Sequence, residues 1–309
     1  MDVSIIIVNY NTKQLLKDCL NSIYEHTENI SFEVIVSDNG SKDGSIEMLK
    51  AEFPQIILIE NNANLGFGKA NNKGLAIAKG KYIFYLNSDT ILLNNAVKLF
   101  FDYFEENGKK ENIGALGCNL LDKQGNINAS YASYASYPNF NEKIIDLIHA
   151  NYGLWKHILF KLIHKKINNT GKKKTYYEKK IGEVGFIIGA DLFIENNEFA
   201  KFDEKYFLYL EETDLEWNLH KKTGKKCYLI EGPKIIHLEG ESSKDSRMLP
   251  YYDLTSFSGQ CKCISRVYYC KKNYSKFKSL IIKVLTLLLW LNPLIIKYTY
   301  KSIFKLLKA

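Results

Sequence analysis

Residues 81–92 read KYIFYLNSDTIL and join a strand pattern to a polar ending. Residues 82–86 are an unbroken run of β-favouring residues, which is typical of a strand buried on both faces of a parallel sheet. The run stops at Asn87-Ser88-Asp89. Residues of these types cap helices and form turns, so the triplet by itself fits either turn chemistry or a carboxylate delivered to a ligand site.

Strand and helix patterns alternate through the first hundred residues. Strand-like segments cover 3–11, 32–41, 55–62 and 81–92, and helical patterns cover 12–27, 43–53 and 64–80. Thr12 stands where the N-cap of the first helix is expected. Strands joined by helices at this spacing form right-handed crossovers and a parallel sheet covered by helices on both faces. The sequence therefore predicts an α/β fold with a mainly parallel, Rossmann-like sheet.

Each of these four strand patterns ends in hydrogen-bonding residues. The polar ends are residues 9–11, 37–40, 61–62 and 87–89. In an open parallel sheet, ligands bind just outside the carboxyl ends of the strands. Any one polar end is ordinary turn chemistry, but four of them at one edge predict a nucleotide pocket.

The pattern becomes mixed after residue 93. A helix is expected at 96–106 and a strand at 113–122, and residues 183–194 return to core-like sequence. Residues 202–224 are expected to form a strand or turn that leads into a helix ending at Gly224, and residues 225–243 a hairpin-like pair of strands. Residues 129–140, which repeat Ala-Ser-Tyr, form either a short edge strand or a loop. Residues 141–180 combine an apolar helical pattern with a lysine run.

The net charge of the chain is unevenly spread. The 309 residues, 46% of them apolar, are enough for one large or two ordinary domains. Eleven of the 42 Lys and Arg lie in 254–309, which contain no Asp or Glu, so residues 1–253 carry a net charge of −3. A second lysine-rich patch covers 156–180. This distribution argues against a nucleic-acid-binding core and favours contact with anionic lipid.

The six cysteines are scattered along the chain, and the N-terminus starts MDVSIIIVNYN without a basic leader. These features predict free thiols in a reducing cytosol and no signal peptide. Cys261, Cys263 and Cys270 could ligate a metal, but no fourth Cys or His follows closely. Buried or bystander thiols are therefore the expectation.

Asp89 and His237 are candidate ligands for a divalent cation. A cation that bridges the two phosphates of a sugar nucleotide needs oxygen ligands at a rigid strand end, and one carboxylate with phosphates and water is enough. His237 follows two isoleucines in IIHLEGESS and is either a second ligand or an ordinary edge histidine.

Three carboxylates in four residues, Glu211, Glu212 and Asp214, follow an aromatic cluster in YLEETDLEW. At a helix start they complement the helix dipole. The pair Glu211-Glu212 directly follows apolar residues, and a partly desolvated carboxylate beside an acceptor hydroxyl is what a general base requires. The glycine-rich NLGFGKANNKG is neither a dinucleotide-binding fingerprint nor a P-loop, although amides at a helix start could face a phosphate.

Taken together, seven segments resemble the inverting family 2 glycosyltransferases with the GT-A fold, and among them the bacterial rhamnosyltransferase-like branch. In the family's order they are SIIIVNYN, VIVSDNGSKDGS, NLGFGKANNKGL, YIFYLNSDTIL, GFIIGADLFI, FDEKYFLYLEETDLEW and IIHLEGES, and they cover about residues 3–245. Each segment alone is a weak or moderate signal, and the set is strong.

The resemblance implies a donor site and a metal. Asn87-Ser88-Asp89 stands where the family has Asp-x-Asp, so Asp89 alone would hold Mn²⁺ or Mg²⁺, with His237 as its partner on the diphosphate. The residues expected around the nucleotide sugar are Asn9, Tyr10 and Asp38 at the base, Asn64, Gly66 and Asn71 near the ribose and diphosphate, and Asn87 and Ser88.

The resemblance also implies a single displacement with inversion. Glu212 would deprotonate an acceptor hydroxyl, with Glu211 and Asp214 in support, and Asp191 in GFIIGADLFI would touch the donor sugar or the acceptor. The implied donor is dTDP-rhamnose or a UDP-hexose. The acceptor would be a glycan or a polyprenyl-diphosphate-linked glycan used in cell-surface polysaccharide synthesis.

The basic C-terminal region predicts contact with a membrane. Residues 280–296 are apolar except for three positions and are interrupted by Pro293, which makes them a flawed candidate for a spanning helix. Lysines and aromatic residues on both sides suit a segment that lies in the membrane interface, and packing on the enzyme itself is the alternative. The expected location is the inner face of the bacterial cell membrane.

The expected domains are a transferase domain at 1–250 and a basic region at 251–309. The transferase domain would comprise a nucleotide-binding half at 1–95 and an acceptor half at 96–250 with a basic insertion at about 141–180. Two other classes stay open: a nucleotidyltransferase, which usually has a glycine-rich basic loop where this chain has NYNTKQ, and a non-catalytic, membrane-associated sugar-nucleotide-binding protein.

Overall fold

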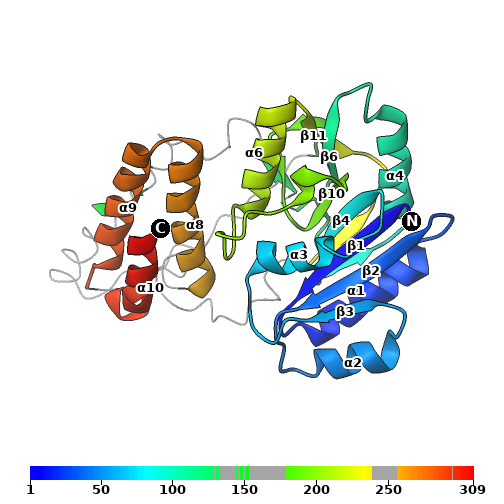
Figure 1. Cartoon of the computed structure of the whole chain (residues 1–309), viewed down its shortest axis with the longest axis horizontal. Coiled ribbons are helices and arrows are strands. Elements are labelled where there is room, and N and C mark those ends of the chain that lie inside the picture. The colour runs from blue at the N-terminus through cyan, green and yellow to red at the C-terminus, as the bar shows by residue number, and fades with distance from the viewer. Residues whose placement is uncertain are drawn as a thin grey trace. The chain divides into compact units, whose positions relative to one another are not determined.

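The computed structural model describes residues 1–128, 130–132, 144, 147–148, 151–152, 179–238, 256–293 and 295–309 (Figure 1). The chain divides into two compact units. The sheet unit comprises Met1–Tyr137, Tyr176–Phe207 and Glu211–Lys244, and the helical unit comprises Pro138–Thr175, Leu208–Leu210 and Asp245–Ala309. The predicted basic insertion and the residues after 238 in IIHLEGESS lie mostly outside the described residues.

The sheet unit is built on an eight-stranded sheet with the order β3-β2-β1-β4-β10-β6-β11-β8. The strands are β1 (Val3–Asn9), β2 (Phe32–Asp38), β3 (Ile57–Glu60), β4 (Tyr82–Asn87), β6 (Ile113–Cys118), β8 (Gly182–Val184), β10 (Asp191–Glu195) and β11 (Lys226–Ile230). β1, β2, β3 and β4 run parallel, as do β6 and β11. β10 is antiparallel to both of its neighbours, β4 and β6. The predicted mainly parallel α/β sheet is confirmed.

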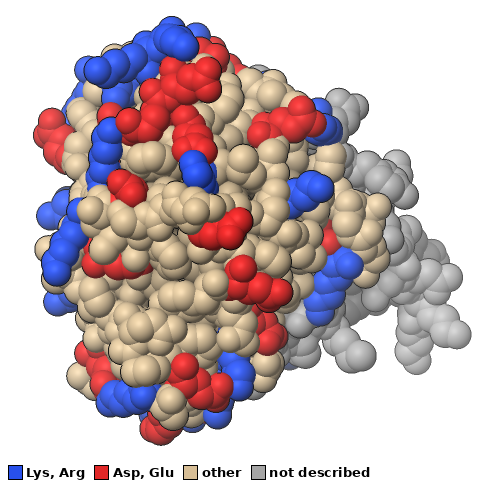
Figure 2. All heavy atoms as spheres, turned by 90° about the vertical axis from the view of Figure 1, so that its right-hand side faces the viewer, with Lys and Arg blue, Asp and Glu red and all other residues tan. Residues whose placement is uncertain are grey.

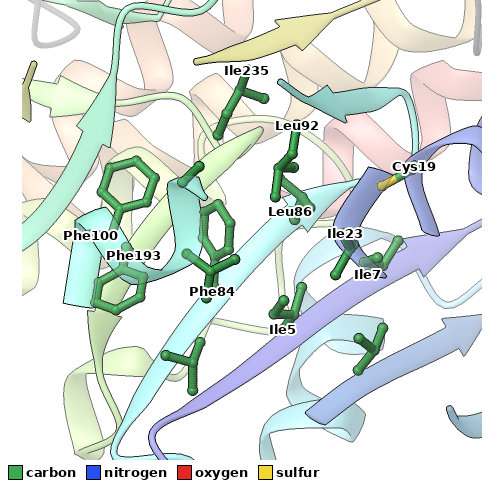
Figure 3. Packing of buried hydrophobic residues seen from close by; sticks show 14 of the residues in the cluster. Ile5, Ile7, Cys19, Ile23, Phe84, Leu86, Leu92, Phe100, Phe193 and Ile235 are labelled. Atoms are coloured by element: carbon green, nitrogen blue, oxygen red, sulfur yellow. The ribbon is translucent and has the colours of Figure 1, made fainter. Parts of the chain in front are cut away.

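Helices pack on both faces of this sheet. The helices are α1 (Lys13–His26), α2 (Ser45–Glu52), α3 (Phe67–Leu75), α4 (Ala96–Asn107) and α6 (Glu211–Thr223). Ile5 and Ile7 join a core with residues of α1, α2 and α4, whereas Ile6 joins a core with residues of α6. Because successive side chains of a strand point to opposite faces, the continuous apolar runs supply both cores. Figure 3 shows Ile5, Ile7 and Phe84 in the first of these cores.

Two short sheets accompany the main one. β5 (Thr90–Leu92) pairs antiparallel with β12 (Ile235–His237), and β7 (Tyr131–Ala132) pairs with β9 (Phe186–Ile187). A short 3₁₀ turn, η2, covers Glu198–Ala200. The predicted hairpin at 225–243 is wrong, because β11 pairs with β6 and β8 while β12 pairs with β5. Of the Ala-Ser-Tyr repeat, the described part includes β7, and most of the rest lies outside the described residues.

The helical unit contains α8 (Phe257–Asn273), α9 (Lys276–Trp290) and α10 (Ile296–Lys308). Ser256 and Ser275 cap α8 and α9 by accepting from Gly259 N at 3.0 Å and Lys278 N at 3.1 Å. The unit has its own apolar core, which includes Val267, Cys270, Ile282, Leu289, Trp290 and Leu306. In the part of the chain that the structure describes, none of the helices has the length and apolarity needed to cross a bilayer.

The six cysteines are all free and buried, as expected. On the face drawn in Figure 2, acidic and basic side chains are interspersed. Ion pairs at the surface of the sheet unit include Lys98–Asp102 at 2.6 Å. Exposed pairs of this kind add little stability, at about 0–1 kcal/mol each.

Candidate functional site

A chain of polar side chains connects the carboxyl ends of β1, β2 and β4. Asn9 donates from Nδ2 to Asp38 Oδ2 at 2.7 Å, and Thr12 donates from Oγ1 to Asn9 Oδ1 at 2.6 Å. The Thr12 hydroxyl also lies 3.0 Å from Ser88 Oγ. The predicted convergence of polar strand ends at one edge is therefore present, and its members hold one another.

Asp38 shapes the turn that follows β2. Its Oδ1 accepts from the backbone amides of Gly40 at 2.9 Å and Ser41 at 2.8 Å, while Oδ2 accepts from Asn9. The carboxylate has no exposed surface. A direct bond from Asp38 to a nucleobase stays a prediction, whereas Tyr10, next to Asn9, is exposed at this edge.

Asp89 and His237 lie side by side. Asp89 occupies the break between β4 and β5, and the pairing of β12 with β5 places His237 opposite Thr90. Asp89 Oδ1 is 3.4 Å from His237 Nε2, and both side chains are buried. Leu238 N also donates to Asp89 O at 2.9 Å, which holds the two segments together.

These two side chains fit the ligand set of a divalent cation. Neighbouring ligands of an octahedral ion with bonds near 2.1 Å lie about 3 Å apart, close to the observed separation of carboxylate and imidazole. Within the described residues, no group of three or more His, Cys, Asp or Glu is arranged to hold a metal. Asp89 and His237 would therefore supply two ligands to such an ion, and phosphate and water oxygens would have to supply the others.

The segment from Gly189 to Asp191 links this pair to the acidic helix. Asn87 N donates to Ala190 O at 3.2 Å, so the segment lies against the end of β4. A Cβ atom placed on Gly189 would lie 3.8 Å from Glu212 Cβ. The segment therefore lies close both to Glu212 and to the end of β4, two residues before Asp89.

The three acidic residues that begin α6 differ in access. Asp214 is buried and accepts from Tyr206 Oη at 3.2 Å and Asn218 Nδ2 at 3.1 Å. Glu211 is buried beside Gly68 of α3, with its Cβ 3.7 Å from an added Cβ there. Glu212 is partly exposed. Of the three residues, Glu212 is the one that keeps appreciable exposed surface.

The backbone before α6 is strained. Tyr209 and Leu210 have φ values of +71° and +69°, a region that bulky residues rarely adopt. Two consecutive residues of this kind cost about 1–3 kcal/mol each, and such strain gathers at functional sites. The strained pair directly precedes Glu211 in the chain.

Gly66 and Phe207 connect the glycine-rich loop to the segment before α6. Phe67 N donates to Phe207 O at 2.9 Å. Gly66 has φ +87°, and a Cβ there would lie 2.3 Å from Phe207 O. Asn64 Oδ1 accepts from Gly66 N at 3.0 Å, and buried Asn71 donates to Phe67 O at 3.2 Å. These two asparagines, predicted near the ribose and diphosphate, shape this loop.

Asp191 is a fully buried carboxyl at the start of β10. Its Oδ2 accepts from Cys118 N at 2.7 Å, and its Oδ1 has no hydrogen-bond partner among the described residues. Burial raises the pKa of Asp191 to about 8, while the bond from Cys118 and the charge of His237 act to lower it. Its predicted contact with donor or acceptor stays a prediction, because the side chain has no exposed surface.

Glu216 is another fully buried carboxyl, and it was not among the predicted site residues. Both of its oxygens accept from Ile187 N, at 3.0 and 3.2 Å, which ties α6 to β9. Burial raises its pKa well above the ordinary value, and the charge of Glu212 adds to this effect. The signal in the sequence was its position in the acidic helix, one turn after Glu212.

Thr12 and Asn72 were also missed as site-building residues. Thr12 precedes α1 as expected, but its side chain does not cap the helix and bonds to the strand ends instead. Asn72 exchanges two bonds with the backbone of Phe202, each at 2.9 Å. The contacts of Thr12 with Ser88 and of Asn72 with Phe202 join segments that are far apart in the chain. For Thr12, the local sequence had also suggested a different role, as the cap of α1.

Comparison with known proteins gives a consistent family. The model of "Glycosyl transferase family 2" matches residues 4–172. The poly(ribitol-phosphate) beta-glucosyltransferase of Bacillus spizizenii is 31% identical over 38% of this chain and 19% of its own length. The chain thus spans about a fifth of that relative.

Two further relatives match over more of their length. The Escherichia coli UDP-Glc:alpha-D-GlcNAc-diphosphoundecaprenol beta-1,3-glucosyltransferase WfaP is 30% identical over 59% of this chain and 79% of its own. The Mycobacterium tuberculosis N-acetylglucosaminyl-diphospho-decaprenol L-rhamnosyltransferase is 24% identical over 77% of this chain and 76% of its own.

Solved structures share the fold at low sequence identity. GalNAc-T7, crystallised with UDP, GalNAc and Mn²⁺, has a TM-score of 0.56 at 14% identity, over 90% of this chain and 49% of its own. The mannosyltransferase PcManGT from Pyrobaculum calidifontis, in complex with GDP-Man and Mn²⁺, has a TM-score of 0.51 at 13% identity, over 99% and 75%.

Proposed function

Because the chain belongs to glycosyl transferase family 2 and has the GT-A fold, we propose that it moves a sugar from a nucleotide-sugar donor to a lipid-linked glycan acceptor. The observation that carries this proposal is the placement of the Asp89–His237 pair and the accessible Glu212 around the segment from Gly189 to Asp191. In this proposal, Asp89 and His237 bind charge and Glu212 is the base.

The choice of Glu212 as the base rests on access. Asp214 is committed to Tyr206 and Asn218, and Glu211 is buried against α3, whereas Glu212 is partly exposed. Glu212 takes the proton of the acceptor hydroxyl, and the hydroxyl oxygen attacks the anomeric carbon on the face opposite the diphosphate. The bond from the anomeric carbon to the phosphate oxygen breaks, and the sugar is transferred with inversion.

Asp89 and His237 are the residues that would hold Mn²⁺ or Mg²⁺. When bound, the cation supplies positive charge beside the departing nucleoside diphosphate. The solved structures of GalNAc-T7 and PcManGT both contain Mn²⁺, which supports this choice of ion. The hydrogen bonds among Asn9, Thr12 and Ser88 then hold the backbone next to Asp89.

The acceptor and donor follow from the relatives. WfaP and the mycobacterial rhamnosyltransferase are named for diphosphate-linked polyprenol acceptors, so we propose a polyprenyl-diphosphate-linked glycan here. A UDP-hexose or dTDP-rhamnose is the proposed donor. Such an acceptor confines the reaction to a membrane, and we place the enzyme on the inner face of the bacterial cell membrane, attached through its C-terminal region.

The test is Glu212→Gln in a transfer assay with a panel of sugar nucleotides and a polyprenyl-diphosphate sugar. A lost general base should lower kcat by about 10²- to 10⁴-fold while donor affinity persists. The matched control is Glu47→Gln, an exposed glutamate of α2, which should retain full activity. Full activity in Glu212→Gln would remove this residue from the role of base.

Metal dependence is tested separately. Excess EDTA should abolish transfer, and added Mn²⁺ or Mg²⁺ should restore it, with Asp89→Asn needing a higher metal concentration for the same rate. Undiminished transfer in EDTA would rule out the metal. Donor binding without transfer or donor hydrolysis under any condition would favour a non-catalytic binding protein.

A further inference from the structure

We infer that the exposed apolar side chains of α9 and α10 form a lipid-facing surface, which inserts into the interface of an anionic bilayer without crossing it. This lipid-facing surface consists of Phe277, Leu280, Val284, Leu288 and Leu291 from α9 and its end, and Ile296, Tyr300, Phe304 and Leu307 from α10. All nine residues belong to the helical unit.

The outer face of α9 is apolar. Its exposed large side chains are Phe277, Leu280, Val284 and Leu288, and the phenylalanine is 72% exposed. At 100° per residue these four positions span an arc of about 80° on the helix. The opposite face, with Ile282 and Leu289, supplies the core of the unit. A helix that is apolar on both its buried and its exposed face calls for an apolar partner outside the protein.

α10 adds a second stripe with a basic border. Ile296, Tyr300, Phe304 and Leu307 are exposed, and Phe304 is 73% exposed. They also span about 80° at 100° per residue, and the adjoining sector of similar width contains only lysines. Those lysines are Lys297, Lys301, Lys305 and Lys308. Lysines beside an apolar stripe extend their stems along lipid and place their ammonium groups among the head groups.

The helices that carry the two stripes pack against each other. Lys283 of α9 donates from Nζ to the backbone oxygen of Leu307 at 3.1 Å, so the end of the α10 stripe lies beside the middle of α9. At the other end, the turn from α9 to α10 carries exposed Leu291 and Ile296. Figure 1 shows α9 and α10 next to each other in the helical unit.

Charge selects an anionic bilayer over a second copy of the chain. Residues 254–309 contain eleven Lys and Arg and no Asp or Glu, so two copies placed face to face would repel each other. The same charges are attracted to anionic head groups. α9 has 15 residues and α10 has 13, and the described helices are too short or too polar to span, so the fitting depth is the interface.

The lipid-facing surface is inferred from the exposed side chains alone. Its purpose, access to a lipid-linked acceptor, rests on the proposed function. The experiment uses the full chain and co-sedimentation with vesicles of phosphatidylcholine, with and without phosphatidylglycerol. The wild-type protein should bind the anionic vesicles, and binding should weaken as salt rises. Failure of the wild-type protein to bind anionic vesicles would overturn the inference.

Two sets of variants locate the surface. Phe277→Asp with Phe304→Asp should lower vesicle partition by about 100-fold or more, because two large side chains leave the lipid. Vesicle partition should also fall by about 100-fold, at roughly fivefold for each charge, when Gln replaces Lys297, Lys301 and Lys305 together. The controls in the sheet unit are Leu93→Asp, at an exposed apolar residue, and the replacement of Lys79, Lys109 and Lys110 by Gln. These controls should bind like the wild type.

The remaining outcomes also decide the matter. Stripe variants that bind vesicles like the wild type would overturn the inference. A second result would also overturn it: the wild type is a dimer in light scattering, and the stripe variants are monomers that bind vesicles as the wild type does. The face would then be a contact between copies of the chain. Transfer to a detergent-solubilised acceptor should survive in the stripe variants. An inactive wild-type enzyme that still binds vesicles would refute the proposed function and leave the lipid-facing surface intact.

Discussion

Replacing Asp191 by asparagine should change how the stability of the sheet unit depends on pH. Asp191 is fully buried in β10, and burial raises its pKa from an ordinary value of 3.8 to about 8. Between these two values the folded protein keeps a proton that the unfolded chain releases. The stabilisation is thus fully present below the unfolded pKa and is lost as pH rises toward the folded one.

The size of the effect follows from the shift. One pH unit in this window costs about 1.4 kcal/mol of unfolding free energy, so the step from pH 5 to pH 7 costs at most about 3 kcal/mol. The amide introduced by Asp191→Asn would keep an oxygen for the bond from Cys118 N but would not titrate. The buried amide lowers the baseline by about 1 kcal/mol, so the informative quantity is the slope. Relative to the wild type, Asp191→Asn should gain stability as pH rises from 5 to 8.

The assay is urea unfolding of fluorotryptophan-labelled protein, followed by fluorine NMR. The signal of Trp217, on α6, reports on the sheet unit separately from the helical unit. Asp102→Asn, at an exposed residue of α4, is the matched control and should stay within about 0.5 kcal/mol of the wild type at each pH. A constant difference between Asp191→Asn and the wild type from pH 5 to pH 8 would refute the assignment of a raised pKa to Asp191.

Two further predictions concern contacts that build the site. Gly66→Ala should lower donor affinity and reduce stability by about 2–4 kcal/mol, because the added Cβ meets Phe207 O at 2.3 Å in a positive-φ backbone. Gly125→Ala has φ +80° but open space, so thermal shift should show a smaller loss there, and equal losses would mean that the Phe207 contact is unimportant. Glu216→Gln should be nearly neutral in urea unfolding at pH 7, whereas Glu216→Ala should cost about 1–3 kcal/mol by orphaning Ile187 N. Equal damage from both changes would show that the carboxyl proton, and not the acceptor, is what matters.

The parallel half of the sheet was legible in the sequence. Strand and helix periods are local properties, and the apolar runs at β1, β2 and β4 are long enough to require burial on both faces. The polar residues that end each run were equally visible. The carboxyl edge of the sheet and its candidate residues could therefore be predicted from the local sequence.

The contacts that assemble the site could not be predicted from the sequence. β12 pairs with β5 across more than a hundred residues, and the hairpin expected from adjacent segments did not form. β10 runs antiparallel between β4 and β6, which buries Asp191 and brings Ala190 to Asn87. Local patterns do not specify which distant strand edge a segment will join, because pairing depends on the core that both faces share.

The order of strands and helices, the polar edge and the basic apolar C-terminus were determined by the sequence alone, since each depends on side-chain type at short, regular spacing. The tertiary structure decided which carboxylates remain accessible. Glu212 keeps partial exposure while Asp38, Asp191 and Asp214 are buried, because burial depends on segments that meet only in the folded chain.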